Sequence, residues 1–319
     1  MDEISVSSAV NDVRIIGGKQ YLCAGMKTRD IIILCMAAVL TAMSCDNAKG
    51  PMETELFHWA DSTSCAYLTI DAELPSGSDR VSVGVRRELA GVIDRILSHI
   101  TSYEDERFFA PFPGAEGDTQ GMLAYYRDSA FAVIARLAQA DADERASYIL
   151  EDSDFTDEEK ETMLAGFPRW AYEFGLRKTE DTDRYVVFQS MDYIYMGGAH
   201  GGVIGEGSMT FSKKDGSYVP NIVDASLSDG MQPLLIAGLL RYYSENGYDT
   251  TWDELKESLF IEDGVIPLPS WQPYPSPEGL VFTYQQYEIA SYAEGMPSFV
   301  VPYPDIEPFL TPEAKALGL

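Results

Sequence analysis

The chain has 319 residues and a formal net charge of −28, from 51 acidic and 23 basic side chains. Such an excess of carboxylates repels the phosphates of DNA and RNA, so we exclude nucleic acid as a partner. Hydrophobic residues make up 45% of the chain, a content typical of globular rather than disordered proteins.

The N-terminal region contains a segment typical of a lipoprotein signal peptide. It reads MKTRDIIILCMAAVLTAMSC from Met26 to Cys45, with basic residues at Lys27 and Arg29 and 14 uncharged residues from Ile31 to Ser44. A membrane span needs roughly 20 apolar residues, whereas a signal peptide needs fewer. We therefore predict that residues 1–44 are an upstream extension plus a signal peptide, and that Cys45 is cleaved free and lipidated. The alternative, a cytoplasmic tail followed by one span, is disfavoured by the short apolar run.

Cleavage before Cys45 would leave two cysteines, Cys45 and Cys65. Since Cys45 would carry the lipid, no pair remains for an internal disulfide or a cysteine-based metal site. The sequence contains no His-Glu-x-x-His, P-loop or dinucleotide motif, and we predict neither a metal nor a cofactor. Residues 45–64 are polar and are predicted to be a tether.

Residues 65–183 are predicted to form an N-terminal α+β domain. The alternating segment CAYLTIDAEL indicates a strand from Cys65 to Leu74. Apolar residues recur at helical spacing over Val85–Ile100 and again over Met122–Ala140, which predicts two amphipathic helices. Thr156 and Glu159 have the spacing of a capping box, which predicts the start of a further short helix.

Residues 184–319 are predicted to form a second domain. The segment DRYVVFQSMDYIYMGG alternates like a strand, and GSMTFSKKDGSYVP reads as a hairpin turning at Asp215-Gly216. Helices are expected over Leu234–Tyr243 and after Thr251, and two strands within residues 279–303. Helices and strands do not alternate one for one, so we predict an α+β fold of two domains, with helices packed on antiparallel or mixed sheets.

Three separated segments carry a family resemblance. They are Tyr-x-Gly-Gly-Ala-His at residues 195–200, the aromatic segment from Phe282 to Gly295, and the strand-like Val300–Tyr303. In this order they resemble the C-terminal domain of the RsiV-like proteins, the domain of unknown function 3298. At Gln285 and Gln286 the chain departs from the Asn-Pro that many members carry. Residues 65–183 resemble, more loosely, the smaller PdaC/RsiV-like domain that precedes it in the same family.

The resemblance implies extracytoplasmic recognition. One type of member is a membrane anti-sigma factor whose outer domain binds lysozyme, another carries a peptidoglycan deacetylase domain, and many others are lipoproteins. This chain has no convincing membrane span, sigma-binding tail or deacetylase metal motif. Regulation of a sigma factor and deacetylation are therefore not expected here.

Six residues are candidates for ligand binding. Two, Trp271 and Tyr287, are C-terminal aromatics, and we expect Trp271, between prolines, to be an exposed anchor. The other four lie at the end of the predicted strand: Tyr195, Gly197, Gly198 and His200. His200 can act as a general base or ligand donor, or it can lock a glycine-rich bend by bonding to the backbone. We favour the structural role, because no nucleophile or carboxylate partner is evident from the sequence.

We therefore predict a lipid-anchored protein of the cell envelope of a Gram-negative bacterium, periplasmic or surface-exposed. Its expected function is to bind an uncharacterised ligand, with lysozyme or a peptidoglycan fragment as the partner, rather than to act as an enzyme. The alternative is a cell-envelope hydrolase acting through His200 and a carboxylate. A structural lipoprotein without a small ligand is a third possibility.

Overall fold

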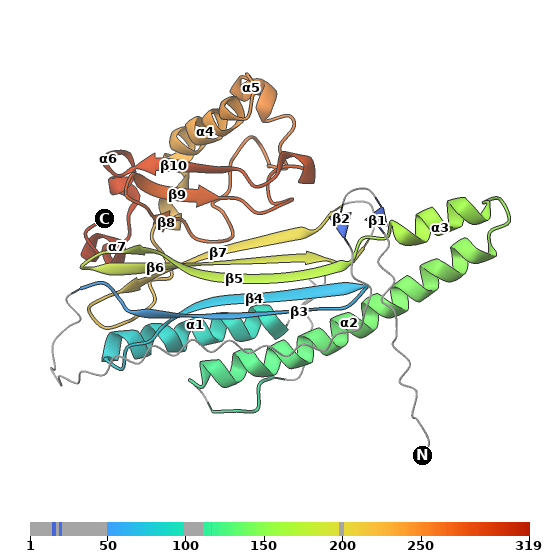
Figure 1. Ribbon diagram of the computed structural model, residues 1–319. Coiled ribbons are helices and arrows are strands. Elements are labelled where there is room, and N and C mark those ends of the chain that lie inside the picture. The colour runs from blue at the N-terminus through green and yellow to red at the C-terminus, as the bar shows by residue number, and fades with distance from the viewer. Residues whose placement is uncertain (1–14, 17–18, 21–49, 99–110, 116, 198–200) are drawn as a thin grey trace, which may run out of the picture. The chain divides into compact units, whose positions relative to one another are not determined.

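The computed structural model describes residues 15–16, 19–20, 50–98, 111–115, 117–197 and 201–319. Strands β1 (Ile15–Ile16) and β2 (Lys19–Gln20) pair with each other and belong to a separate N-terminal unit. Residues 50–319 lie in one compact unit, whose described part contains seven α-helices, a five-stranded sheet and a three-stranded sheet (Figure 1). The predicted α+β class is confirmed.

The five-stranded sheet has the order β3-β4-β5-β6-β7. These strands are β3 (Thr54–Ser62), β4 (Ala66–Pro75), β5 (Trp170–Asp181), β6 (Tyr185–Tyr195) and β7 (Val203–Ser212). Neighbours are antiparallel except β4 and β5, which are parallel. A parallel pair needs a long crossover connection, and here the connection contains three helices.

The crossover contains three helices, and the first two cover one face of this sheet. The three are α1 (Arg80–Ser98), α2 (Thr119–Glu151) and α3 (Asp157–Ala165). Helix α1 and the first part of α2 pack against the even-numbered residues of β4, β5 and β6, such as Leu68, Phe174 and Phe188, and form the first hydrophobic core. The predicted capping box at Thr156 is present, but α3 buries no residue. Both long helices extend beyond their predicted N-terminal ends, and α2 also runs past its predicted C-terminal end.

The second core is built mainly by the C-terminal third of the chain. Its helices are α4 (Ser228–Glu245), α5 (Trp252–Leu255), α6 (Tyr303–Ile306) and α7 (Pro312–Ala316). The antiparallel strands β8 (Tyr274–Pro275), β9 (Gly279–Thr283) and β10 (Ser298–Pro302) form the smaller sheet. Tyr185 and Val187 of β6 belong to this second core, whereas Val186 and Phe188 belong to the first. The first half of strand β6 therefore separates the two cores and is buried on both faces.

Two predicted boundaries fall inside the five-stranded sheet. Residues 54–62, assigned to the tether from the sequence, form its edge strand β3. The predicted domain boundary at 183/184 lies in the short connection between β5 and β6, which are antiparallel neighbours. The sheet therefore continues across both positions.

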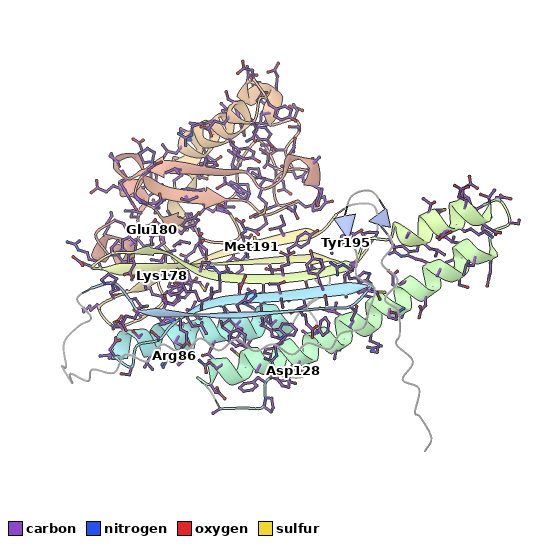
Figure 2. All side chains as sticks on the ribbon, viewed as in Figure 1. Arg86, Asp128, Lys178, Glu180, Met191 and Tyr195 are labelled. Carbon is purple, nitrogen blue, oxygen red and sulfur yellow. The ribbon has the colours of Figure 1, made fainter. Side chains whose placement is uncertain are left out.

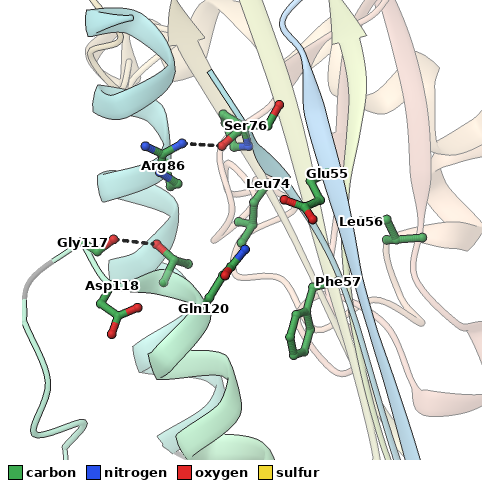
Figure 3. A pocket seen from close by; sticks show the side chains of 11 residues that line it. Glu55, Leu56, Phe57, Leu74, Ser76, Arg86, Gly117, Asp118 and Gln120 are labelled. Carbon is green, nitrogen blue, oxygen red and sulfur yellow. Dashed lines mark hydrogen bonds between the residues drawn. The ribbon is translucent and has the colours of Figure 1, made fainter. Parts of the chain in front are cut away.

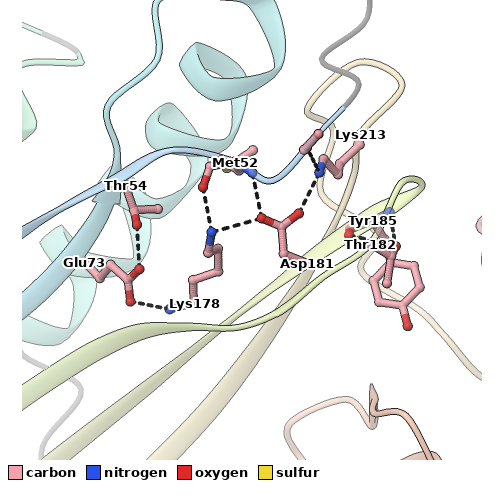
Figure 4. A network of polar contacts seen from close by, with 9 residues as sticks. Met52, Thr54, Glu73, Lys178, Asp181, Thr182, Tyr185 and Lys213 are labelled. Atoms are coloured by element: carbon pink, nitrogen blue, oxygen red, sulfur yellow. Dashed lines mark hydrogen bonds and ion pairs between the residues drawn. The ribbon is translucent and has the colours of Figure 1, made fainter. Parts of the chain in front are cut away.

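A polar network fastens residues 50–52 to the ends of β5 and β7 (Figure 4). The Lys213 Nζ donates to Asp181 Oδ1 at 2.6 Å and to the Gly50 carbonyl at 2.5 Å. The Lys178 Nζ donates to Asp181 Oδ2 at 2.9 Å and to the Met52 carbonyl at 2.6 Å, and the Met52 N–H also donates to Asp181 Oδ2. The charges of Lys178, Asp181 and Lys213 are therefore all paired, and together they hold residues 50–52 against the sheet.

The predicted turn at Asp215-Gly216 is confirmed. Gly216 has a φ of 77°, its N–H donates to the Ser212 carbonyl at 2.8 Å, and a Cβ here would lie 2.6 Å from the Val81 carbonyl oxygen. Only glycine meets both demands. In the part of the chain that the structure describes, no helix combines the length and apolarity that crossing a membrane requires.

Candidate ligand-binding site

The predicted site residues divide into those that the structure describes and those that it does not. Tyr195 and Gly197 end β6 and start the connection to β7, while Trp271 and Tyr287 lie in the C-terminal third. Gly198 and His200, and the predicted lipidation residue Cys45, lie outside the described residues. Their roles stay predictions.

Gly197 lies against the guanidinium group of Arg145, a residue of helix α2. Its φ is 83°, and a Cβ there would come 2.3 Å from Arg145 Nη2 and 3.3 Å from Trp170 Nε1. Both partners are held by Asp141, which accepts from Arg145 Nε at 2.9 Å and from Trp170 Nε1 at 3.0 Å. The sequence motif therefore has a structural reason at this position, because only glycine lets the guanidinium approach the backbone.

Tyrosines gather on the face of the sheet opposite α1 and α2. Odd-numbered residues of β6 point to this face, and Figure 2 shows Met191 and Tyr195 along the strand. Tyr193 lies opposite Glu173 in the β5–β6 register, and the Tyr67 hydroxyl donates to Glu173 Oε1 at 2.8 Å. We call the following set the tyrosine platform: Tyr67, Glu173, Tyr193, Tyr287 and Tyr292.

The platform extends onto the C-terminal third through Tyr292. The Tyr292 hydroxyl donates to the Gly202 carbonyl at 2.8 Å. A Cβ at Gly202 would lie 2.1 Å from Tyr193 Cε2, and one at Gly201 would lie 2.6 Å from the Tyr292 hydroxyl. Gly201 and Gly202, which directly follow the Tyr195–His200 motif, thus make room for the side chains of Tyr193 and Tyr292.

Tyr287 is the most exposed member of the platform. Its side chain is 54% exposed, and its ring centroid lies 5.8 Å from that of Tyr292. Its φ is 64°, in the left-handed region that a bulky residue rarely adopts. Such a conformation costs roughly 1–3 kcal/mol and is found most often at functional sites. The fold therefore presents an aromatic ring to solvent at an energetic cost.

Two phenols of the platform, Tyr67 and Tyr193, have raised pKa values and stay protonated at neutral pH. Burial and the hydrogen bond to Glu173 raise the pKa of Tyr67 to about 12. Burial, together with the neighbouring Tyr292 and Glu173, also raises the pKa of Tyr193. The platform thus offers tyrosine rings, hydroxyl groups and one carboxyl group, and Tyr67 and Tyr193 are suited to donating hydrogen bonds rather than to abstracting protons.

Trp271 is half-buried, which differs from the exposed anchor expected from its flanking prolines. A Cβ at Gly207 of β7 would lie 2.9 Å from Trp271 Cζ3, and the Arg95 guanidinium lies 5.9 Å from the ring centroid. The ring is therefore packed against β7 and α1 and lies apart from the platform.

Gln285 and Gln286 have a role that the sequence analysis did not assign. The Gln286 Oε1 accepts from the Ile204 N–H, and the Gln285 Oε1 accepts from the Glu206 N–H, each at 2.9 Å. The two side chains thus provide hydrogen-bond acceptors for two outward N–H groups of β7, the edge strand, close to the platform. The only sequence signal was their departure from the family pattern.

A carboxyl group with a raised pKa, Asp192, lies at the same end of β6, on the face toward the helices. Burial raises the pKa of Asp192 to about 6. A Cβ at Gly205 would lie 2.6 Å from Asp192 Oδ1, so a glycine on β7 makes room for the carboxyl group. In the described residues, no three His, Cys, Asp or Glu side chains are grouped as a metal site would require.

A pocket of about 310 Å3 lies elsewhere, between β3 and the crossover helices (Figure 3). Phe57 and Leu74 form its apolar part, and Glu55, Arg86 and Asp118 are the charged residues that line it. None of the four predicted ligand-binding residues that the structure describes lines this pocket.

Comparison with known proteins identifies one domain. Residues 221–304 match the family model described as protein of unknown function (DUF3298). They run from the segment before α4 to α6, so the Tyr195–His200 motif precedes the matched region. No curated protein matches the chain.

Two solved structures share the fold over most of the chain. A DUF3298 family protein from Pseudomonas aeruginosa PAO1 is 14% identical, with a TM-score of 0.52, covering 83% of this chain and 97% of its own. A DUF3298 family member from Bacteroides fragilis NCTC 9343 is 15% identical, with a TM-score of 0.59, covering 84% and 98%. Both likenesses extend well beyond residues 221–304. The chain therefore carries a DUF3298 domain at residues 221–304, within a fold that it shares with DUF3298 family proteins.

Proposed function

We propose that this protein is a lipid-anchored binding protein of the bacterial cell envelope, and that its ligand is held on the tyrosine platform. The observation that carries the proposal is the exposed ring of Tyr287, which the backbone presents in a left-handed conformation beside Tyr292. An exposed aromatic residue held at an energetic cost favours a role in recognition.

The chemistry of the platform suits two kinds of ligand. Tyrosine rings supply rigid contact area with little loss of side-chain entropy, and their hydroxyl groups donate hydrogen bonds. A net charge of −28 complements a strongly basic protein such as lysozyme. The same rings can also stack on the sugar rings of a cell-wall fragment. We rank lysozyme first because the charge favours it.

Anchoring through Cys45 is part of the proposal. Four residues, 46–49, separate Cys45 from Gly50, and Gly50 is fastened by Lys213 to the end of the sheet. At about 3.5 Å per residue, a lipidated Cys45 would hold Gly50 within about 18 Å of the membrane surface. A periplasmic or surface-exposed protein anchored in this way would work close to its membrane.

We further propose that the chain is an RsiV-like protein. In this proposal the residues before the matched DUF3298 segment correspond to the smaller PdaC/RsiV-like domain followed by the first part of the RsiV-like domain. The proposal rests on the Tyr195–His200 and Phe282–Gly295 segments of the sequence.

Biolayer interferometry of residues 46–319 against c-type lysozyme and against muropeptides tests the proposed function. We expect micromolar or tighter binding of one of them that persists at moderate salt, since exposed charges alone are screened. Replacing Tyr287 with Ala should weaken binding by about tenfold or more, as expected for an aromatic anchor. Tyr248→Ala is the matched control, because Tyr248 is 65% exposed and its ring packs on Tyr243, which is not part of the platform.

Two outcomes would contradict the proposal. One is the absence of binding to either probe, and the other is an equal effect of the Tyr287 and Tyr248 substitutions. Incubation of the wild type and His200→Ala with peptidoglycan addresses the hydrolase alternative in the same series. If the wild type releases soluble fragments and the variant does not, the protein is a hydrolase rather than a binding protein.

A further inference from the structure

The two edges of the five-stranded sheet are treated differently. At β7, Gln285 and Gln286 accept from two outward N–H groups, and the Val219 N–H donates to the Thr210 carbonyl at 2.9 Å. At β3, the Ser62 N–H donates to its neighbour Asp61 Oδ1 at 2.8 Å, and no other backbone group on the outer side has a partner among the described residues. One edge is therefore closed by the C-terminal third of the chain, and the other is open.

The register identifies the open groups. The Ser76 N–H donates to the Glu53 carbonyl at 2.9 Å, and the Thr63 N–H donates to the Ala66 carbonyl at 2.7 Å. In an antiparallel pair, inward and outward backbone groups alternate. Odd-numbered residues of β3 therefore face β4, and even-numbered residues direct their N–H and C=O groups outward. These are Thr54, Leu56, His58, Ala60 and Ser62.

Apart from the acidic residues Glu55 and Asp61, strand β3 lacks the usual devices that block an edge. Natural edge strands are often short, bulged, or protected by proline or lysine. Strand β3 has nine residues and pairs with β4 without a register shift, and it contains neither proline nor lysine. Its Leu56 side chain is 55% exposed. The strand thus offers about 30 Å of open edge.

A pocket lies at one end of this edge. Glu55, Leu56 and Phe57 of β3 line the pocket together with residues of α1, β4 and the start of α2 (Figure 3). The Arg86 guanidinium donates to the Pro75 and Gly77 carbonyls at 2.6 and 3.1 Å. Asp118 Oδ1 accepts from the Gly121 N–H. Glu55 lies on the strand itself, and its carboxyl group has no hydrogen-bond or ion-pair partner in the described part of the chain.

The acidic charge of β3 favours a basic peptide over a second copy of this chain as the strand that pairs with it. From Gly50 to Ser62 the chain carries Glu53, Glu55 and Asp61 and no lysine or arginine. A second copy pairing edge to edge would bring acidic residues beside acidic residues, which is unfavourable. A basic strand would instead meet opposite charges.

We propose that β3 binds, by strand addition, an extended peptide segment of another protein with alternating apolar and basic side chains. The main-chain groups of the even-numbered residues would pair with the peptide, and one of its side chains would enter the pocket beside Glu55 and Phe57. Strand addition of this kind draws affinity from the backbone and specificity from alternate side chains. This site is separate from the tyrosine platform and does not depend on it.

Hydrogen exchange with a designed peptide tests the proposal. The probe is a capped nonapeptide of alternating valine and lysine, added to residues 46–319, with a valine–glutamate peptide as its acidic counterpart. We expect the basic peptide to slow exchange at the outward amides of Leu56, His58 and Ala60, and the acidic peptide to leave them unchanged.

A matched pair of variants at one position separates edge pairing from surface charge. Ala60→Pro removes one outward N–H and no bond to β4, so it should weaken binding of the basic peptide by about tenfold. Ala60→Val keeps the N–H and should bind within about twofold of the wild type. Glu55→Gln should weaken binding without changing the exchange of the free protein.

Three results would overturn the proposal. They are equal binding by the proline and valine variants, protection that maps outside β3, and protection of β3 that rises with protein concentration when no peptide is present. The last result would identify a second copy of this chain as the occupant.

Discussion

The Lys213 Nζ lies 2.6 Å from Asp181 Oδ1, with the lysine side chain 1% exposed and the carboxylate side chain 12% exposed. Lys213 is on the connection after β7, and Asp181 is at the end of β5. Their contact links the end of β5 to the segment after β7, and both residues also bond to the backbone of residues 50–52. The stability of this corner therefore depends on one carboxylate.

Replacing Asp181 with Ala should destabilise the protein by about 3–5 kcal/mol. The loss arises because Lys213 would remain buried without its counter-ion, which costs more than losing the pair itself. Urea unfolding followed by circular dichroism measures the change. Asp253→Ala is the control, because Lys256 and Asp253 form an exposed pair, and it should leave the midpoint unchanged. Equal effects of the two substitutions would contradict the assignment.

Asp181 should also contribute to acid denaturation. Burial alone would raise its pKa, but the hydrogen bonds from Lys213, Lys178 and Met52 outweigh burial and lower it. A carboxyl group with a lowered folded-state pKa stabilises the fold above its unfolded pKa of about 4, and this contribution is lost as the pH falls through the folded value. Melting temperatures between pH 2 and pH 7 should therefore fall less steeply for Asp181→Asn than for the wild type. Parallel curves would rule out this contribution.

Asp192 should have the opposite dependence. Burial raises its pKa to about 6, so the folded state holds its proton more tightly than the unfolded state does. Its charge destabilises the fold increasingly as the pH rises from about 4 to above 6, by at most about 3 kcal/mol. Asp192→Asn should therefore melt at a higher temperature than the wild type at pH 8, and the advantage should disappear near pH 4. An advantage that is independent of pH would instead indicate a packing effect.

Two glycines in helices should respond oppositely to the same substitution. A Cβ at Gly238 of α4 would lie 2.1 Å from Phe299 Cδ2 in the second core, whereas a Cβ at Gly91 of α1 would meet nothing within 4 Å. We expect Gly238→Ala to lower the free energy of unfolding by about 1–3 kcal/mol through overpacking. Gly91→Ala should raise it by about 0.5–1 kcal/mol, because alanine is the better helix former. Chemical denaturation of both variants measures the difference, and a stabilising Gly238→Ala would contradict the described packing.

Local patterns in the sequence predicted much of the fold. The helical spacing of Val85 and Leu89 placed α1, and the Thr156 and Thr251 capping boxes are both formed. The alternation over residues 185–195 placed β6. These signals act over a few residues, so they can be read without knowing the tertiary partners.

Features that depend on distant residues were not predicted. Six of the nine residues of strand β3 are exposed, so it resembled a tether until its pairing with β4 was known. Strand β5 pairs in parallel with β4 only after a connection of three helices. At the candidate site, the sequence singled out Tyr195, Gly197 and Tyr287, but not the contact of Tyr67 with Glu173, which are 106 residues apart.

Strand β6 constrains how this architecture can change over evolution. Over Tyr185–Phe188 its odd-numbered and even-numbered side chains belong to different cores, so inserting or deleting a single residue there would exchange the two sets. Val187 would turn toward the helices and Phe188 toward the C-terminal sheet, and neither core would retain its complement of side chains. Length variation among relatives should therefore be tolerated in the connections around β6 and excluded from the strand itself.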